Sequence, residues 1–158
     1  RMENYYQLAQ SLSPERYRIF VTGLKEEGEA MRSELPDIFN LEHVVDMTGR
    51  LSLDELMSFI VQADGLVACS TGVLHLAAAL GKNALGLYSP MRPIHPGRWM
   101  PIGRQANYLV IRKECSSCRR SKECQCVNDI SWQEVKRSVE KFVTGATTPV
   151  AKHGAYLR

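Results

Sequence analysis

Ala68-Cys69-Ser70-Thr71-Gly72-Val73-Leu74-His75-Leu76-Ala77-Ala78-Ala79-Leu80-Gly81 follows a short apolar strand at 65–68 and has the composition of a helix. Ser70 and Thr71 are residue types that favour the N-terminal cap of a helix. The helix body is apolar almost all round, so we predict that it is buried against a sheet. Gly81 is expected to end the helix, because glycine readily adopts the left-handed conformation found there.

The start of this predicted helix has the properties of an anion-binding site. The first N–H groups of a helix have no partner within it, and the helix dipole places about half a positive charge there. Gly72 lets a ligand approach the backbone, and His75 leans back toward the same donors. The pattern favours a phosphate site; the alternative is an ordinary Ser-Thr-Gly turn beside a packed histidine.

Strands and helices alternate along the rest of the chain. We predict strands at 17–21, 42–46, 65–68, 83–88 and 107–111, and helices at 2–11, 25–35, 52–62, 70–81 and from 131 onward. This order predicts an α/β fold, Rossmann-like, with a mostly parallel sheet, flanking helices and right-handed crossovers.

The spacing of apolar residues indicates which helical side chains are at least partly buried. The expected positions are Tyr6, Ala9 and Gln10, then Leu53, Leu56, Met57 and Ile60, and finally Val135, Val139 and Phe142. Ser52 with Glu55, and Ser131 with Glu134, have the spacing of a capping box, so their first role is structural. His43, on a strand edge, is also expected to be structural.

Length and composition favour a soluble domain. The 158 residues suit one domain, and 44% hydrophobic with 23% charged residues is ordinary for a globular protein. No apolar run approaches the about 18 residues of a membrane-spanning helix, and no signal-peptide pattern is present. A net charge of +3 is too small to indicate a nucleic-acid partner. We predict one domain over residues 1–145 and a tail over 146–158.

Two further turns follow predicted strands, where open α/β sheets bind ligands. Gly23 precedes a helix whose first turns carry Glu26 and Glu27, and such carboxylates also simply complement a helix dipole. Residues 89–104 contain four prolines and therefore cannot form a regular element. This segment is either a substrate-holding loop or a stiff connector with solvated cations, and it carries Arg92, His95, Arg98 and Arg104.

The cysteines are unevenly spread. Cys69 stands apart, whereas four others crowd together as Cys115, Cys118, Cys124 and Cys126. Cys-x-x-Cys is typical of half a zinc site, but the following Cys-x-Cys is too tight for an ordinary zinc knuckle. These four are weak metal candidates, and the other interpretations are a structural loop, reduced or partly disulfide-bonded, and a redox role.

The run from Ser70 to Gly81 resembles the signature of the heptosyltransferase family, glycosyltransferase family 9, which reads Asp-Ser/Thr-Gly-x-x-His-x-Ala-Ala-Ala-Leu-Gly. Ser70 stands where the family has Asp, so this sequence departs from the signature at its first position. The segment 48–56, Thr-Gly-x-x-Ser-Leu-x-Glu-Leu, is similar to the family as well. Family members have the GT-B architecture of two Rossmann-like halves. The resemblance implies that residues 1–145 are the C-terminal, donor-binding half.

The resemblance also implies the ligand and its contacts. The donor would be a nucleotide-diphosphate sugar, ADP-heptose-like, bound without a metal or other cofactor. The resemblance implies that Ser70, Thr71, Gly72 and His75 bind the diphosphate. After the turn at Gly23, Glu27 is the first candidate to bind the ribose, and Glu26 is the second. Arg92 would lie at the cleft between the two halves. The general base belongs to the N-terminal acceptor half, which we expect outside this sequence. No catalytic residue is therefore assigned, and the fragment alone is expected to be inactive.

The implied reaction is transfer of the sugar to a lipopolysaccharide-type glycan. The partners would be the missing N-terminal domain and a glycolipid acceptor, which implies a cytoplasmic location at the inner face of the membrane. One alternative is a non-catalytic Rossmann-like module with a zinc-binding cysteine patch. Another is a different GT-B protein, such as a nucleotide-sugar epimerase, but those usually carry a glutamate at the position of His75.

Overall fold

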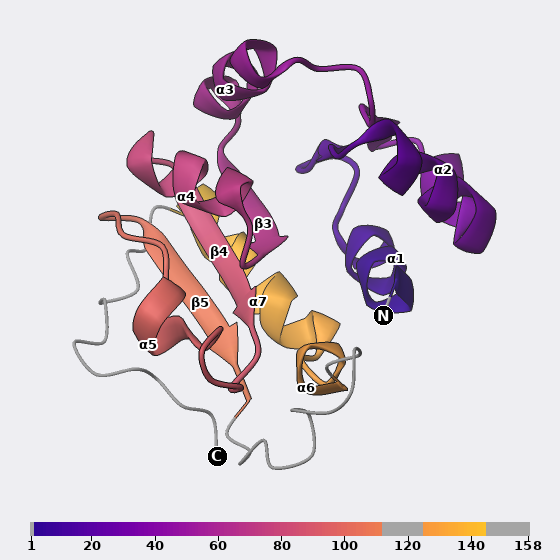
Figure 1. Ribbon diagram of the computed structural model, residues 1–158. Helices are drawn as coiled ribbons and strands as arrows, with labels where there is room; N and C mark the ends of the chain where they lie inside the picture. The colour runs from indigo at the N-terminus through magenta and orange to yellow at the C-terminus, as the bar shows by residue number, and fades with distance from the viewer. Residues whose placement is uncertain (1, 112–124, 145–158) are drawn as a thin grey trace. The chain divides into compact units, whose positions relative to one another are not determined.

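The computed structural model describes residues 2–111 and 125–144 (Figure 1). The chain divides into two compact units, Arg1–Leu56 and Met57–Arg158, and each is described by itself. Every strand pairing in the described ranges is parallel, and helices separate the strands, which confirms the predicted α/β class. The strands lie in a two-stranded and a three-stranded sheet.

The first unit contains one parallel strand pair with helices before and between the strands. Its elements are α1 (Met2–Ser11), β1 (Ile19–Val21), α2 (Lys25–Glu34), the 3-10 helix η1 (Pro36–Asn40) and β2 (Val44–Asp46). β1 pairs with β2 in the register Ile19 to Val44. Buried Ala9, Ile38 and Val44 form the core, against which half-buried aromatic and aliphatic side chains of α1, β1 and α2 pack.

His43 has the structural role that its position predicts. It is 8% exposed, and its Nε2 lies 3.0 Å from the carbonyl oxygen of Ala9, so it ties β2 to the end of α1. Ala9 is buried as expected, but Gln10 is exposed. The side-chain amide of Gln10 instead donates to the Tyr6 hydroxyl at 3.3 Å, one turn back along the same helix.

The second unit contains the three-stranded sheet, in the order β3-β4-β5. Its elements are β3 (Gly65–Cys69), α4 (Gly72–Ala79), β4 (Asn83–Tyr88), α5 (Pro96–Trp99), β5 (Ala106–Val110), α6 (Gln125–Asn128) and α7 (Trp132–Thr144), and α3 (Leu53–Gln62) spans the boundary between the units. β4 is the central strand, and Ala84, Leu85 and Tyr88 are almost completely buried on it. The expected irregular segment 89–104 contains the one-turn helix α5, so it is not irregular throughout.

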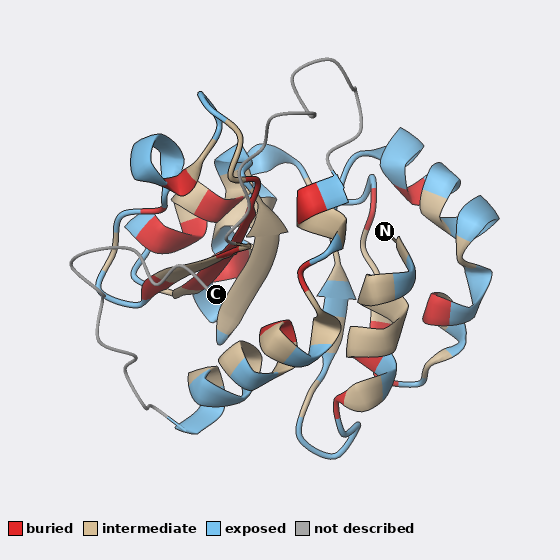
Figure 2. Ribbon diagram, turned by 90° about the horizontal axis from the view of Figure 1, so that it is seen from below, coloured by how far each residue is buried: buried red, intermediate tan, exposed pale blue. Residues whose placement is uncertain are grey.

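α4 packs against β3 and β4 with one face only. Figure 2 shows helices that carry both buried and exposed residues. In α4, Leu74 and Ala77 are fully buried, whereas Leu80, just after the helix, is 40% exposed. The helix is packed against the sheet as predicted, although apolar residues on its outer side, such as Ala79, are exposed. The helix ends as predicted: Gly81 has a φ of +74°, and the amides of Gly81 and Lys82 donate to Ala78 and Ala77 at 3.1 and 3.0 Å. This pattern of hydrogen bonds is a Schellman motif.

Both capping boxes are present. The Ser52 amide donates to the Glu55 carboxylate at 2.8 Å, and the Ser131 amide donates to Glu134 at 3.4 Å. Ile60 and Val135 are buried as expected, whereas Leu53 is 62% exposed, because it lies on the solvent side of the first turn of α3. Leu56, Met57, Val139 and Phe142 are half-buried.

Several predictions fall on residues outside the described ranges. These are the tail 146–158 and three of the four clustered cysteines, Cys115, Cys118 and Cys124. None of the helices that the structure describes is both long and apolar enough to cross a membrane.

Candidate functional site

The turn between β3 and α4 leaves the N-terminus of α4 without a side-chain cap. Thr71 is the N-cap residue, with extended backbone angles, and its side chain makes no capping hydrogen bond. Gly72 follows as the first helical residue, and a Cβ built on it would meet no protein atom within 4 Å. The φ of Gly72 is not positive. The backbone there does not require glycine, and the space in front of it is open.

Ser70 does not cap the helix. The phenol of Tyr88, at the end of β4, donates to the backbone carbonyl of Trp99 in α5. Burial raises the pKa of Tyr88, and the hydrogen bond from Ser70 acts in the opposite direction. Of the two N-cap candidates in the sequence, Thr71 occupies the N-cap position, but its side chain does not cap the helix.

His75 is the fourth residue of α4, one turn from the N-cap. It is half-buried, and among residues 2–111 and 125–144 no hydrogen bond or ion pair holds its ring. It shares the first turn of the helix with Gly72.

Two of the four candidate side chains in segment 89–104 form contacts within the segment itself. His95 is the N-cap of α5, and its Nδ1 accepts the Gly97 amide at 3.1 Å. The Arg98 guanidinium lies 5.4 Å from the centroid of the Trp99 ring, a cation–π contact. Arg92 is exposed, and it has no ion pair with any residue that the structure describes. Arg92 is thus better placed than His95 to contact a charged ligand.

Gly23 and Glu27 are brought together in the turn after β1. Oε2 of Glu27 accepts the Leu24 amide at 2.7 Å, and a Cβ on Gly23 would lie 2.8 Å from that oxygen. The Gly23 carbonyl accepts the Gly49 amide at 2.8 Å, which links this turn to the one after β2. Glu26 is exposed. Glu27 therefore stabilises the start of α2, and one of its carboxylate oxygens is used in doing so.

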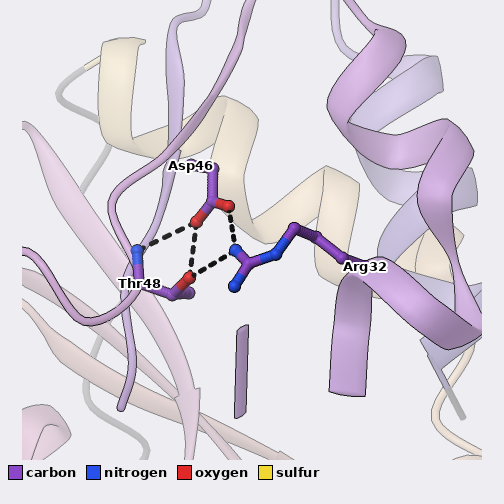
Figure 3. Close-up of polar contacts among 3 residues, drawn as sticks. All are labelled: Arg32, Asp46 and Thr48. Atoms are coloured by element: carbon purple, nitrogen blue, oxygen red, sulfur yellow. Dashed lines mark hydrogen bonds and ion pairs between the residues drawn. The ribbon is translucent and has the colours of Figure 1, made fainter. Parts of the chain in front are cut away.

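A polar cluster at the end of β2 was not predicted. Arg32 of α2 forms an ion pair with Asp46, and the Thr48 hydroxyl donates to Asp46 at 2.6 Å while accepting from Arg32 at 3.1 Å (Figure 3). Burial raises the pKa of Asp46, but the hydrogen bonds from Thr48 and the Arg32 guanidinium outweigh it, so the pKa lies below its usual range. The Asp-Met-Thr-Gly sequence after a strand is the only local sign of this cluster.

No group of three or more His, Cys, Asp or Glu side chains in the described ranges is placed to hold a metal. Cys126, the described member of the cysteine cluster, is 3% exposed. A surface depression of about 430 Å³ lies between β5 and α7, and its lining includes Leu109, Glu134 and Arg137. None of the predicted site residues lines this depression.

Comparison with known proteins identifies the family. The model of glycosyltransferase family 9 (heptosyltransferase) matches residues 1–128. Lipooligosaccharide heptosyltransferase 2 of Haemophilus influenzae is 31% identical over 93 residues, which are 57% of this chain and 27% of that protein. This chain thus matches about a quarter of the length of that curated relative.

Two solved structures share the fold. The E. coli ADP-heptose lps heptosyltransferase II superposes with a TM-score of 0.74 at 22% identity, over 92% of this chain and 42% of that one. The E. coli heptosyltransferase WaaC, solved with ADP, gives 0.68 at 19% identity, over 90% and 39%. The parallel α/β architecture is therefore that of GT-B heptosyltransferases. Because the family model also spans most of the sequence, this chain belongs to glycosyltransferase family 9, the heptosyltransferase family.

Proposed function

We propose that this chain is the donor-binding half of a family 9 glycosyltransferase and holds the diphosphate of a nucleotide sugar at the N-terminus of α4. Gly72 carries the proposal. Glycine costs conformational entropy on folding, and at this position neither the backbone angles nor the packing requires it. Close approach of a ligand to the helix amides accounts for a glycine here.

Charge favours an anion at the same place. The sequence has no Asp or Glu from Gly65 to Lys113, a segment that contains β3, α4 and the loop with Arg92. The amides at the start of α4 lack a capping side chain, and the helix dipole adds to the positive potential there. Thr71 and His75 would supply further hydrogen bonds. Oriented donors of this kind stabilise the charge that develops on a departing nucleoside diphosphate.

The nucleoside would bind to the turn after β1. A carboxylate has about four acceptor positions, and the Leu24 amide uses one of those on Glu27. The remaining positions of Glu27 would accept the ribose hydroxyls, with Glu26 as the second candidate. Gly23 would keep this turn open, and Arg92 would border a cleft between this half and the proposed N-terminal half.

In this proposal the enzyme transfers a sugar from an ADP-heptose-like donor to a lipopolysaccharide-type glycolipid. Support comes from the relatives, which are named as heptosyltransferases, one of them solved with ADP. The general base and the acceptor site would lie in an N-terminal half outside this sequence. The transfer reaction would take place at the cytoplasmic face of a membrane. No metal is needed for this role of the donor half.

Replacing Gly72 with alanine tests the proposal. The added methyl group meets no protein atom, so the melting temperature of Gly72→Ala should equal or slightly exceed that of the parent. Its affinity for ADP, measured by calorimetry, should fall about tenfold or more, because the methyl group occupies the ligand's approach to the amides. Ala79→Ser, on the exposed face of the same helix, is the matched control. Parent-like ADP affinity in Gly72→Ala would remove the main support for this site.

A further inference from the structure

The second half of segment 89–104 exposes large apolar side chains. Trp99 and Met100 are each 45% exposed, and Ile102 is 84% exposed. Single apolar residues are common on protein surfaces, but a group of them so close together marks a surface that contacts a partner or a membrane. We call residues 98–104, which include this group, the apolar loop.

The backbone of the apolar loop is fastened on both sides of the exposed group. The Trp99 carbonyl accepts a hydrogen bond from the Tyr88 hydroxyl, at the end of β4. Further along, a Cβ on Gly103 would lie 2.7 Å from the carbonyl oxygen of Ala78, so the loop packs directly against α4. Pro101, between the exposed side chains, is buried. The exposure of the apolar side chains is therefore a property of a packed backbone and not of a loose loop.

The charge that accompanies this loop is positive. Arg98 and Arg104 stand at its two ends, both exposed, and the sequence from Gly65 to Lys113 has no Asp or Glu. The Arg98 guanidinium lies 5.4 Å from the centroid of the Trp99 ring, so a cation and an amphipathic ring are presented together. Arginine and tryptophan beside aliphatic side chains are typical of surfaces that bind the interface of an anionic bilayer.

We propose that the apolar loop is a membrane-contact surface. Trp99, Met100 and Ile102 enter the interface of the bilayer, and Arg98 and Arg104 bind the phosphates of anionic lipids. The inference deepens the proposed function and rests on it for the reason that a glycolipid acceptor requires the enzyme to meet a membrane.

The attachment of the loop places this contact near the proposed donor site. Tyr88, which holds the Trp99 carbonyl, is the last residue of β4, and the turn before α4 follows the end of β3, the strand paired with β4. Parallel strands bring their carboxyl ends to one edge of the sheet. The Trp99 end of the loop therefore lies at the same edge as the turn that would hold the diphosphate.

Vesicle sedimentation tests the membrane contact. The chain is mixed with vesicles of phosphatidylcholine and phosphatidylglycerol, or of phosphatidylcholine alone, and the bound fraction gives a partition coefficient. Binding to the anionic vesicles should weaken as salt is added and should be about tenfold or more stronger than binding to the neutral ones. Ile102→Ser should lower the partition coefficient about tenfold, and Arg104→Gln about fivefold.

Two controls remove the same kinds of side chain elsewhere. Leu53→Ser changes an apolar residue of α3 that is 62% exposed, and Arg16→Gln changes an exposed arginine of the first unit. Both should sediment as the parent does. Equal losses in the controls and in the loop variants would overturn the assignment of membrane binding to this loop.

Trp99 fluorescence shows whether the loop itself enters the bilayer. The sequence has two tryptophans, so Trp132→Phe leaves Trp99 as the single reporter. Anionic vesicles should shift its emission to shorter wavelength. Sedimentation without this shift would overturn the proposal, because another surface would then bind. A shift that follows protein concentration without vesicles would assign the loop to a second copy of the chain and overturn it as well.

Calorimetry with ADP, in the absence of vesicles, separates this inference from the proposed function. Ile102→Ser and Arg104→Gln should bind ADP with parental affinity. ADP binding without any sedimentation on anionic vesicles would overturn the membrane contact alone and leave the loop to a protein partner, such as the proposed N-terminal half. Sedimentation that depends on Ile102 and Arg104, in a chain that does not bind ADP, would overturn the donor site and support the membrane contact.

Discussion

The guanidinium of Arg32 on α2 and the carboxylate of Asp46 at the end of β2 form an ion pair, with the Thr48 hydroxyl bonded to both (Figure 3). The amide of Thr48 also donates to Asp46, at 2.9 Å. These contacts fasten α2 to the turn after β2 within the first unit. Because the Arg32 side chain is 43% exposed, the ion pair itself contributes little, and the hydrogen bonds to Asp46 matter more.

Asp46 should make the stability of the first unit depend on acid pH. A carboxyl whose pKa is lower in the folded than in the unfolded chain stabilises the fold above its unfolded pKa, and this stability is lost as the pH falls through the folded pKa. Asp46→Asn should lower the free energy of unfolding at pH 7 by about 1 kcal/mol. Denaturant titrations should show this difference shrinking below about pH 4. Glu34→Gln, at an exposed position of α2, is the control.

Gly28→Ala should destabilise the chain even though alanine favours helices. A Cβ on Gly28 would lie 1.9 Å from the Thr48 hydroxyl oxygen, so α2 or the turn must shift. We expect a loss of about 1–3 kcal/mol, which exceeds the gain of about 1 kcal/mol in helix propensity. Ser33→Ala, at an exposed position of the same helix, should change stability by a few tenths at most. Chemical denaturation of both variants measures the difference, and a stabilised Gly28→Ala would contradict the observed packing.

His75→Ala should weaken the binding of both ADP and inorganic pyrophosphate by about tenfold, which corresponds to about 1.4 kcal/mol. The imidazole has no partner among the described residues, so the melting temperature should change little. Isothermal titration calorimetry gives both affinities. Unchanged affinities would show that His75 is a packed helix residue rather than a diphosphate contact.

Glu27→Gln should distinguish the contribution of the ribose to ADP affinity from that of the diphosphate. Glutamine keeps a carbonyl oxygen for the Leu24 amide but loses the charge that strengthens bonds from ribose hydroxyls. Its affinity for ADP should fall several-fold, whereas its affinity for pyrophosphate should stay at the parental value. Glu26→Gln is the matched control on the same turn. If the control loses ADP affinity and Glu27→Gln does not, the ribose contact belongs to Glu26.

Features that depend on residues close together in the chain could be predicted from the sequence. The Ser52 and Ser131 capping boxes, the Gly81 helix end and the bounds of α1 and β4 all agree with expectation. The signature at 70–81 likewise pointed to the family that the comparison identifies. Each of these needs only hydrogen bonds or backbone angles within a few residues, so neighbouring side chains determine them.

Contacts between distant segments depended on the tertiary structure. The sequence marked both Ser70 and Thr71 as helix caps, but in the fold Thr71 occupies the N-cap position and its side chain makes no capping hydrogen bond. Likewise, the pairing of Arg32 with Asp46 and the exposure of Leu53 follow from how helices lie against strands. A polar side chain forms the bonds that its surroundings offer, and those surroundings exist only once parallel strands have brought their ends to the same edge of a sheet.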